Sequence, residues 1–130
     1  MPEFRDEVPG AEEYRAMRLA AGLNARTAEA AAIGLPNSLH AICVREDGRL
    51  IGMGRVIGDG GTFAQITDIA VLPEKQGQGI GHEIVARLVA WCNRSLPASC
   101  YLSLIADPPA DRIYAKFGFD HAVGMGRTIP

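Results

Sequence analysis

The stretch Val71-Leu72-Pro73-Glu74-Lys75-Gln76-Gly77-Gln78-Gly79-Ile80-Gly81 marks the end of a predicted strand and the start of a predicted helix. An apolar run over residues 66–72 ends at Pro73, and a glycine-rich turn then leads into residues with the apolar spacing of an amphipathic helix. A strand, a glycine turn and a helix start present free backbone N–H groups to an anion. The ligand expected at this turn is therefore a phosphate or a pyrophosphate.

Two well-known phosphate loops fit these residues poorly. A P-loop requires Gly-Lys followed by Ser or Thr, whereas Gly81 is followed by His82 and Glu83. A dinucleotide fingerprint, Gly-x-Gly-x-x-Gly, opens the first strand–helix unit of its domain. Here the third glycine comes one position early, and the unit lies midway along the chain. The P-loop interpretation fails and the dinucleotide interpretation is weak.

Two motifs in this chain resemble those of one enzyme family. The segment Gln76–Gly81 resembles the Gln/Arg-x-x-Gly-x-Gly/Ala signature of the GNAT superfamily, the acetyl-CoA-dependent N-acetyltransferases. Residues 68–73 resemble that family's fourth strand, which ends in Val-x-Pro, and Ile113–Phe119 resembles its Leu-Tyr-x-Lys-x-Gly-Phe motif. The motifs lie in the family's order, and the resemblance extends over roughly residues 39–119.

Hydrophobic periodicity and turn residues predict alternating strands and helices along the chain. The expected strands are residues 4–8, 39–44, 50–57, 62–71 and 101–105, and a further one from Phe119 onward. The expected helices are residues 11–20, 26–33, 80–95 and 111–117. This pattern gives an α/β (α+β) protein with a mixed, mainly antiparallel central sheet flanked by helices. The GNAT resemblance further implies that the fourth and fifth strands splay apart around the pantetheine arm of CoA.

The resemblance implies that acetyl-CoA is the co-substrate and assigns residues to it. The backbone of the glycine loop would cradle the pyrophosphate, through Gln76, Gly77, Gln78, Gly79, Ile80 and Gly81. Backbone groups of Ile69, Ala70 and Val71 would bond to pantetheine as an added strand does, and a free N–H there could polarise the thioester carbonyl. The competing interpretation of the glycines is a tight turn that binds no ligand.

Tyr114 and Asp107 are the next candidates. Tyr114 aligns with the family tyrosine that lies near the CoA sulfur and acts as general acid, a role that suits a phenol with an ordinary pKa near 10. Its alternative role is that of a core tyrosine. Asp107 stands where many relatives carry an asparagine that contacts the cofactor or a water. An aspartate loses the amide donors and adds a charge, so it could bind the substrate ammonium, act as a base or start the short helix.

Asp68 and two glycines are unexpected within predicted strands. Burying an unpaired carboxylate is costly, so Asp68 is either a base that deprotonates the amine or half of a structural ion pair, for example with Arg55. Gly52 and Gly54 weaken a strand, and close approach of a ligand or a helix is the physical reason to have them there.

Composition narrows the class of protein. With 130 residues and 48% hydrophobic content, residues 1–130 are expected to form one domain. A net charge of −2 and a pI near 5.9 give no electrostatic reason to expect nucleic acid or an anionic membrane as a partner. The start of the chain has no signal segment, and three cysteines with no metal spacing suit a reducing compartment. The expectation is a cytoplasmic enzyme without a metal.

The resemblance to the GNAT superfamily implies an N-acetyltransferase that moves acetyl from acetyl-CoA to a primary amine by direct attack. The acidic balance and Asp68 favour a small cationic acceptor such as an arylalkylamine or a polyamine. A protein or peptide amine is the enzymatic alternative, and a non-catalytic acyl-CoA-binding module is the alternative from a different class. Dimers are common in the family, so a homodimer is among the expected assemblies.

Overall fold

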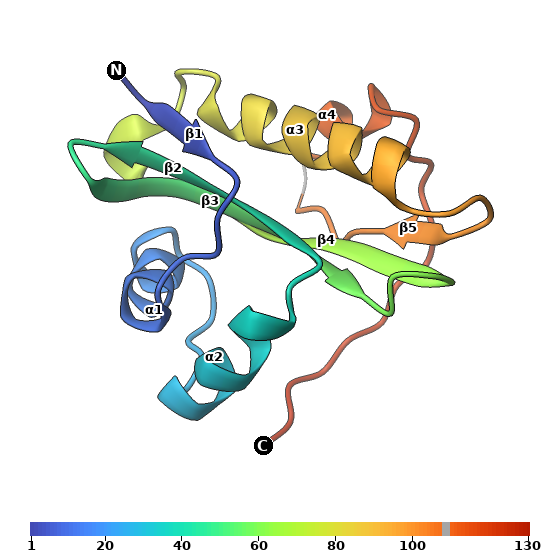
Figure 1. Cartoon of the computed structure of the whole chain (residues 1–130), viewed down its shortest axis with the longest axis horizontal. Coiled ribbons are helices and arrows are strands. Elements are labelled where there is room, and N and C mark those ends of the chain that lie inside the picture. Colours follow the sequence, from blue (N-terminus) through green and yellow to red (C-terminus); the bar gives the residue numbers. More distant parts are fainter. Residues whose placement is uncertain (108–109) are drawn as a thin grey trace.

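The computed structural model describes residues 1–107 and 110–130, which form a five-stranded sheet with helices on both faces (Figure 1). The strands are β1 (Glu3–Arg5), β2 (His40–Glu46), β3 (Arg49–Gly58), β4 (Phe63–Val71) and β5 (Tyr101–Ser103). The α-helices are α1 (Ala11–Ala20), α2 (Ala28–Gly34), α3 (Ile80–Ser95) and α4 (Asp111–Ala115), and two 3₁₀ turns are η1 (Leu35–Asn37) and η2 (Pro73–Lys75).

The sheet has the order β1-β2-β3-β4-β5, antiparallel from β1 to β4 and parallel between β4 and β5. The pairs between the last two strands run only from Phe63↔Tyr101 to Gln65↔Ser103. Beyond Gln65, β4 continues to Val71 without pairing to β5. The expected fold class is confirmed, and β4 and β5 separate after Gln65.

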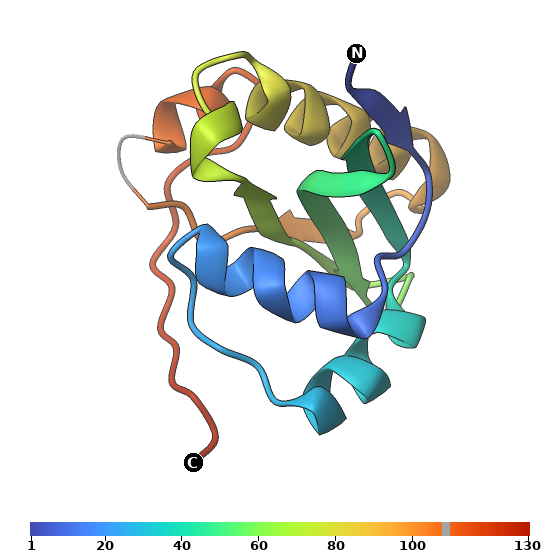
Figure 2. The same cartoon turned by 90° about the vertical axis from the view of Figure 1, so that its left-hand side faces the viewer.

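The helices divide between the two faces of the sheet. Figures 1 and 2 show α1 and α2 on one face and α3, with α4 beside it, on the other. Helix α3 turns an apolar face onto the sheet, and its buried residues are Ile80, Ile84, Val85, Leu88, Val89 and Cys92. The main core therefore lies between α3 and the central strands, as the helical spacing of these residues predicts.

Gly54 explains how closely α3 approaches the sheet. A Cβ atom at this position would lie 2.7 Å from both Ile69 Cδ1 and Ile84 Cγ2, and 2.9 Å from Leu88 Cδ1. Real Cβ contacts are longer than this, so only glycine fits under the helix. Close approach of a helix, one of the two reasons expected for a glycine here, is what the structure shows.

A β-bulge interrupts β4 opposite Gly54. Met53 pairs with Ala70 and Arg55 pairs with Thr67, so Asp68 and Ile69 together face the single residue Gly54. Asp68 has φ +58°, in the left-handed region that few residues other than glycine adopt. Bulges of this kind redirect side chains and backbone groups next to active sites.

The strand predicted from Phe119 onward is wrong, because residues 119–130 form no strand. Strand β5 is also shorter than predicted and ends at Ser103. A strand needs a partner edge for its backbone groups, and residues 119–130 pair with no strand of the described sheet. In the described residues, no helix is long and apolar enough to cross a membrane.

Candidate active site

The glycine loop ends in a helix start that can bind an anion. Gly79 caps α3 with φ +82°, a conformation that a residue with a Cβ adopts only with strain. In the described part of the chain, the backbone N–H groups of residues 77–82 have no hydrogen-bond acceptor. These donors and the positive end of the helix dipole suit a phosphate or pyrophosphate.

The side chains of the loop serve mainly to hold it in place. Gln76 Nε2 donates to the backbone oxygen of Val71 at 3.1 Å and so joins the loop to the end of β4. Lys75 forms an ion pair with Glu46 at 2.5 Å. Because this ammonium already has a partner, the backbone donors provide the principal attraction for an anion at the loop.

The edge of β4 that faces β5 is the second part of the site. Ala70 and Val71 pair with β3 on the other edge, while the last pair with β5 lies back at Gln65. Backbone groups of Ile69–Val71 on the β5 side are therefore available to an extended ligand, in the manner of an added strand. This is the position predicted for the pantetheine arm.

Asp68, at the bulge, lies in a buried polar network. Its Oδ1 accepts a hydrogen bond from Arg18 Nη1 at 2.5 Å, and its Oδ2 accepts from Arg55 Nε at 2.8 Å and from the Tyr14 hydroxyl at 2.9 Å. Arg55 continues the network through Nη1 to Ser38 Oγ at 2.9 Å. The Asp68 side chain is only 3% exposed. Both carboxylate oxygens are thus engaged by donors from α1 and β3.

The ion pair between Asp68 and Arg55 is the one named in the sequence analysis as the structural alternative. Tyr14 and Arg18, the partners from α1, were missed in the sequence analysis, although their spacing was visible in the sequence. Tyr14 and Arg18 are four residues apart and share one face of α1. Burial and the neighbouring negative charge of Asp68 raise the pKa of Tyr14, so this phenol stays protonated and donates to the carboxylate.

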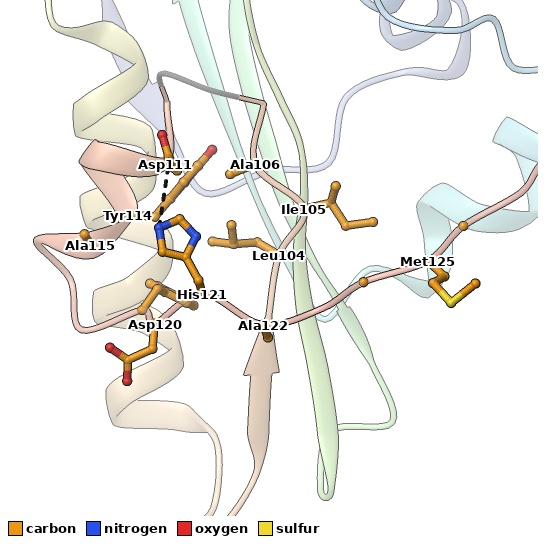
Figure 3. Close-up of a pocket in the computed structure, with 13 residues that line it drawn as sticks. Leu104, Ile105, Ala106, Asp111, Tyr114, Ala115, Asp120, His121, Ala122 and Met125 are labelled. Atoms are coloured by element: carbon orange, nitrogen blue, oxygen red, sulfur yellow. Dashed lines mark ion pairs between the residues drawn. The ribbon is translucent and has the colours of Figure 1, made fainter.

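Tyr114, on α4, lines a cavity of about 430 Å³ between α4, the residues after β5 and the C-terminal segment (Figure 3). Its ring meets Phe119 edge-on, with ring centroids 6.3 Å apart. Burial, with a smaller contribution from the negative charge of Asp107, raises the pKa of Tyr114. The phenol therefore stays protonated at neutral pH and can donate a proton to an anion.

Asp107 is exposed and acts on Tyr114 through its charge. Its backbone oxygen accepts a hydrogen bond from Ala110 N at 2.9 Å, and Ala110 directly precedes α4. Pro108 and Pro109, which the sequence interpretation noted beside Asp107, lie outside the described residues.

An aromatic contact joins the first turn of α3 to the segment that follows α4. His82, in the first turn of α3, packs on Phe117 with ring centroids 5.5 Å apart, and Phe117 lies two residues after the end of α4. Figures 1 and 2 show α4 beside α3, the helix that follows the glycine loop. The structure therefore brings together two motifs that are about 35 residues apart in the sequence. Among residues 1–107 and 110–130, no group of His, Cys, Asp or Glu side chains could hold a metal ion.

The separation of β4 from β5 and the anion-binding start of α3 agree with what the GNAT resemblance implies. The sequence profile of the Acetyltransferase (GNAT) family matches residues 5–119. The chain belongs to the GNAT family of acetyltransferases, whose typical co-substrate is acetyl-CoA.

Individual relatives agree with this assignment. A crystal structure of a protein of unknown function from meticillin-resistant Staphylococcus aureus, described as a probable acetyltransferase, is 45% identical. It superposes with a TM-score of 0.92 over 99% of this chain and 100% of that one. The chloroplastic GCN5-related N-acetyltransferase 2 of Arabidopsis thaliana is 38% identical over 77 residues, which are 58% of this chain and 29% of that protein.

A third relative carries the name of a protein substrate. The "Putative [ribosomal protein bS18]-alanine N-acetyltransferase" of Bacillus subtilis (strain 168) is 32% identical over 83 residues, 61% of this chain and 52% of that protein. This chain thus spans between 29% and 52% of the length of these curated relatives.

Proposed function

We propose that this protein transfers the acetyl group of acetyl-CoA to a primary amine by direct attack of the amine on the thioester. The free edge of β4 beyond Gln65, next to the unpartnered N–H groups of residues 77–82, is the observation that carries this proposal. The first feature suits the extended pantetheine arm and the second suits the pyrophosphate. Both lie at one end of β4 and so match a single CoA molecule.

The chain's own groups perform three tasks in this reaction. Backbone N–H groups of the loop hold the pyrophosphate, and an N–H at the bulge polarises the thioester carbonyl. As the new N–C bond forms and the C–S bond breaks, Tyr114 donates its proton to the leaving thiolate. The attacking nitrogen loses its extra proton to water, and the phenolate recovers a proton from solvent. Holding the reactants in place accounts for much of the remaining acceleration.

Asp68 has two roles to be compared within this mechanism. Its three donors favour a positioning role, in which the carboxylate holds the bulge and therefore the N–H that polarises the thioester. In the alternative role, Asp68 is the base that deprotonates the amine. The pairing with two guanidinium groups also removes the argument that Asp68 attracts a cationic arylalkylamine or polyamine.

The acceptor is a small primary amine in our proposal, and a protein N-terminus is the second candidate. The observation that favours the second is the Bacillus subtilis relative named for the alanine of ribosomal protein bS18. A small amine is favoured by the small size of the pocket on the α1 and α2 side of the sheet, about 120 Å³, which is lined partly by Arg55, a partner of Asp68.

The test is release of CoA thiol from acetyl-CoA by the purified protein with arylalkylamines, polyamines, amino acids and peptides with free N-termini. Tyr114→Phe is expected to lower kcat about 100-fold, the low end of general acid catalysis, while KM for acetyl-CoA changes little. Tyr101→Phe is the control, because Tyr101 is 56% exposed on β5.

Each outcome has a distinct meaning. An unchanged kcat in Tyr114→Phe would remove the general-acid role. Tight CoA binding without thiol release for any acceptor would favour a non-catalytic acyl-CoA-binding module. Absence of CoA binding would refute the assignment of the glycine loop itself.

A further inference from the structure

A second, smaller cavity lies on the opposite face of the sheet from α3. Its volume is about 120 Å³, and its lining residues come from α1, the α1–α2 connection, α2, η1 and β3: Tyr14, Arg26, Ala30, Ala31, Gly34, Leu35 and Arg55. Two of these side chains are positively charged and none is acidic. The remainder of the wall is the neutral side chain of Tyr14 and apolar residues.

The buried charges beside this cavity do not balance. Arg18 and Arg55 are 6% and 8% exposed, and the single carboxylate of Asp68 pairs with both of them. The nearby acids of α1 have other partners, since Glu12 pairs with Arg15 and Glu13 pairs with Arg45. A buried guanidinium without a counter-charge is costly, so the site as it stands holds one positive charge in excess.

Arg55 offers part of this charge to the cavity. Its Nε donates to Asp68 and its Nη1 to Ser38 and to the backbone oxygen of Gly34. Among the described residues, Nη2 of Arg55 has no protein acceptor. Every fully buried side-chain nitrogen in that part of the chain has a hydrogen-bond partner. Nη2 is therefore not fully buried and is reached by solvent. Arg26 lines the same cavity, and its side chain donates only to the backbone oxygen of Ala25, at 3.2 Å.

We propose that this cavity binds an oxyanion of the acceptor, so that the acceptor is a small primary amine that also carries a carboxylate or a phosphate group. This inference rests on the proposed acetyltransferase function and specifies its substrate class. Arginine binds both oxyanions through paired N–H donors. An anion between Arg26 and Arg55 would supply the missing counter-charge.

Size and position agree with this occupant. A cavity of about 150 Å³ accommodates a molecule the size of benzene, so about 120 Å³ suits a carboxylate or phosphate with a short carbon chain. Arg55 pairs in the sheet with Thr67, the residue directly before Asp68 at the bulge. The anionic end of the acceptor would thus lie one strand away from the backbone that receives the thioester.

The experiment compares acceptors that differ only in charge. Straight-chain amino acids from glycine to 5-aminopentanoate are each paired with their own carboxamide and with the aminoalkylphosphonate of the same length. Rates are compared at equal concentrations of the neutral amine, because the carboxamides have more acidic ammonium groups. We expect kcat/KM to be at least tenfold higher for an anionic acceptor than for its carboxamide. Comparison of each amino acid with the phosphonate of the same length shows whether the cavity prefers a carboxylate or a phosphate-like group.

A substitution at the cavity wall tests the site itself. Arg26→Gln is expected to raise KM for the preferred anionic acceptor about tenfold and to leave KM for its carboxamide unchanged. Arg26 is exposed and outside the Asp68 network, so the variant is expected to fold. Arg94→Gln, which makes the same charge change at the far end of α3, is the matched control.

Failure of this inference is distinguishable from failure of the proposed function. Thiol release that is as fast with the carboxamides as with the anionic acceptors would overturn the inference and leave the acetyltransferase intact. If no acceptor leads to thiol release, the oxyanion site is tested by calorimetric titration of the protein with 4-aminobutanoate and with 3-aminopropylphosphonate. Binding that is lost in Arg26→Gln would support the oxyanion site, and no binding of either compound would overturn it.

Discussion

Asp68→Asn is the substitution that most directly tests the polar network at the bulge. Asparagine has nearly the same shape, and it also tolerates the left-handed backbone that Asp68 adopts at φ +58°. The substitution therefore removes the negative charge and leaves the backbone of β4 without added strain. Arg18 and Arg55 would then lie buried with no counter-charge.

The expected loss of stability follows from that imbalance. Removing one partner of a buried ion pair costs about 3–5 kcal/mol, because the remaining charge stays buried and uncompensated. The asparagine oxygen still accepts a hydrogen bond, so we expect a loss near the lower limit, about 3 kcal/mol. For an m-value of about 2 kcal/mol per molar urea, the unfolding midpoint would fall by about 1.5 M.

The assay is urea unfolding followed by circular dichroism, with Asp47→Asn as the matched control. Asp47 also has a left-handed backbone, with φ +52°, but it is exposed. A change within about 0.5 kcal/mol is therefore expected for the control. A loss below about 1 kcal/mol in Asp68→Asn would refute the argument that this carboxylate compensates two buried guanidinium groups.

The same variant separates the two catalytic roles of Asp68. If the carboxylate positions the bulge, kcat falls while the acidic limb of the pH–rate profile stays in place. If Asp68 is the base, that limb disappears with the carboxylate. A natural domain is stable by about 5–15 kcal/mol, so the variant remains folded for kinetics at 25 °C.

Three further predictions concern the sheet, the glycine loop and the cysteines. Gly54→Ala is expected to cost about 1–3 kcal/mol in urea unfolding, because the added Cβ overlaps α3. Gly79→Ala is expected to weaken CoA binding in calorimetry, since its φ of +82° strains a residue with a Cβ by about 1–2 kcal/mol. A thiol reagent is expected to modify Cys100 first, because burial raises the pKa of Cys43 to about 12 and of Cys92 to about 11.

Each of these has its own control. Gly34→Ala is the control for Gly54→Ala, because Gly34 has helical backbone angles and a Cβ there would meet nothing within 4 Å. Equal losses in both variants would contradict the packing argument. Unchanged CoA affinity in Gly79→Ala would show that the loop backbone does not hold the ligand. Cys100→Ser should abolish the fastest phase of reaction with the thiol reagent. A fast phase that persists in this variant would contradict the prediction that Cys100 reacts before Cys43 and Cys92.

Local sequence patterns predicted the elements that surround the site. The helix from Ile80 to Ser95 was predicted with its observed bounds, because its apolar spacing and the preceding glycines are local signals. Gly54 was predicted to lie under a close neighbour, because glycine weakens a strand and is favoured there where another group approaches the backbone closely. The predicted strand from Phe119 onward failed, since strand formation depends on a partner edge and not only on the residues of the segment.

The family, the glycine loop and the candidate residues Tyr114 and Asp68 could be recognised from the amino-acid sequence alone. The partners of Asp68 on α1 emerged only in the folded chain, because Arg18 and Tyr14 lie 50 and 54 residues away from it in the sequence. The packing of these elements also brings Arg26 and Arg55 into the wall of one cavity, beside which positive charge exceeds negative charge. Motifs and periodicity describe short stretches of chain, whereas the charge balance of a buried site depends on how distant elements pack together.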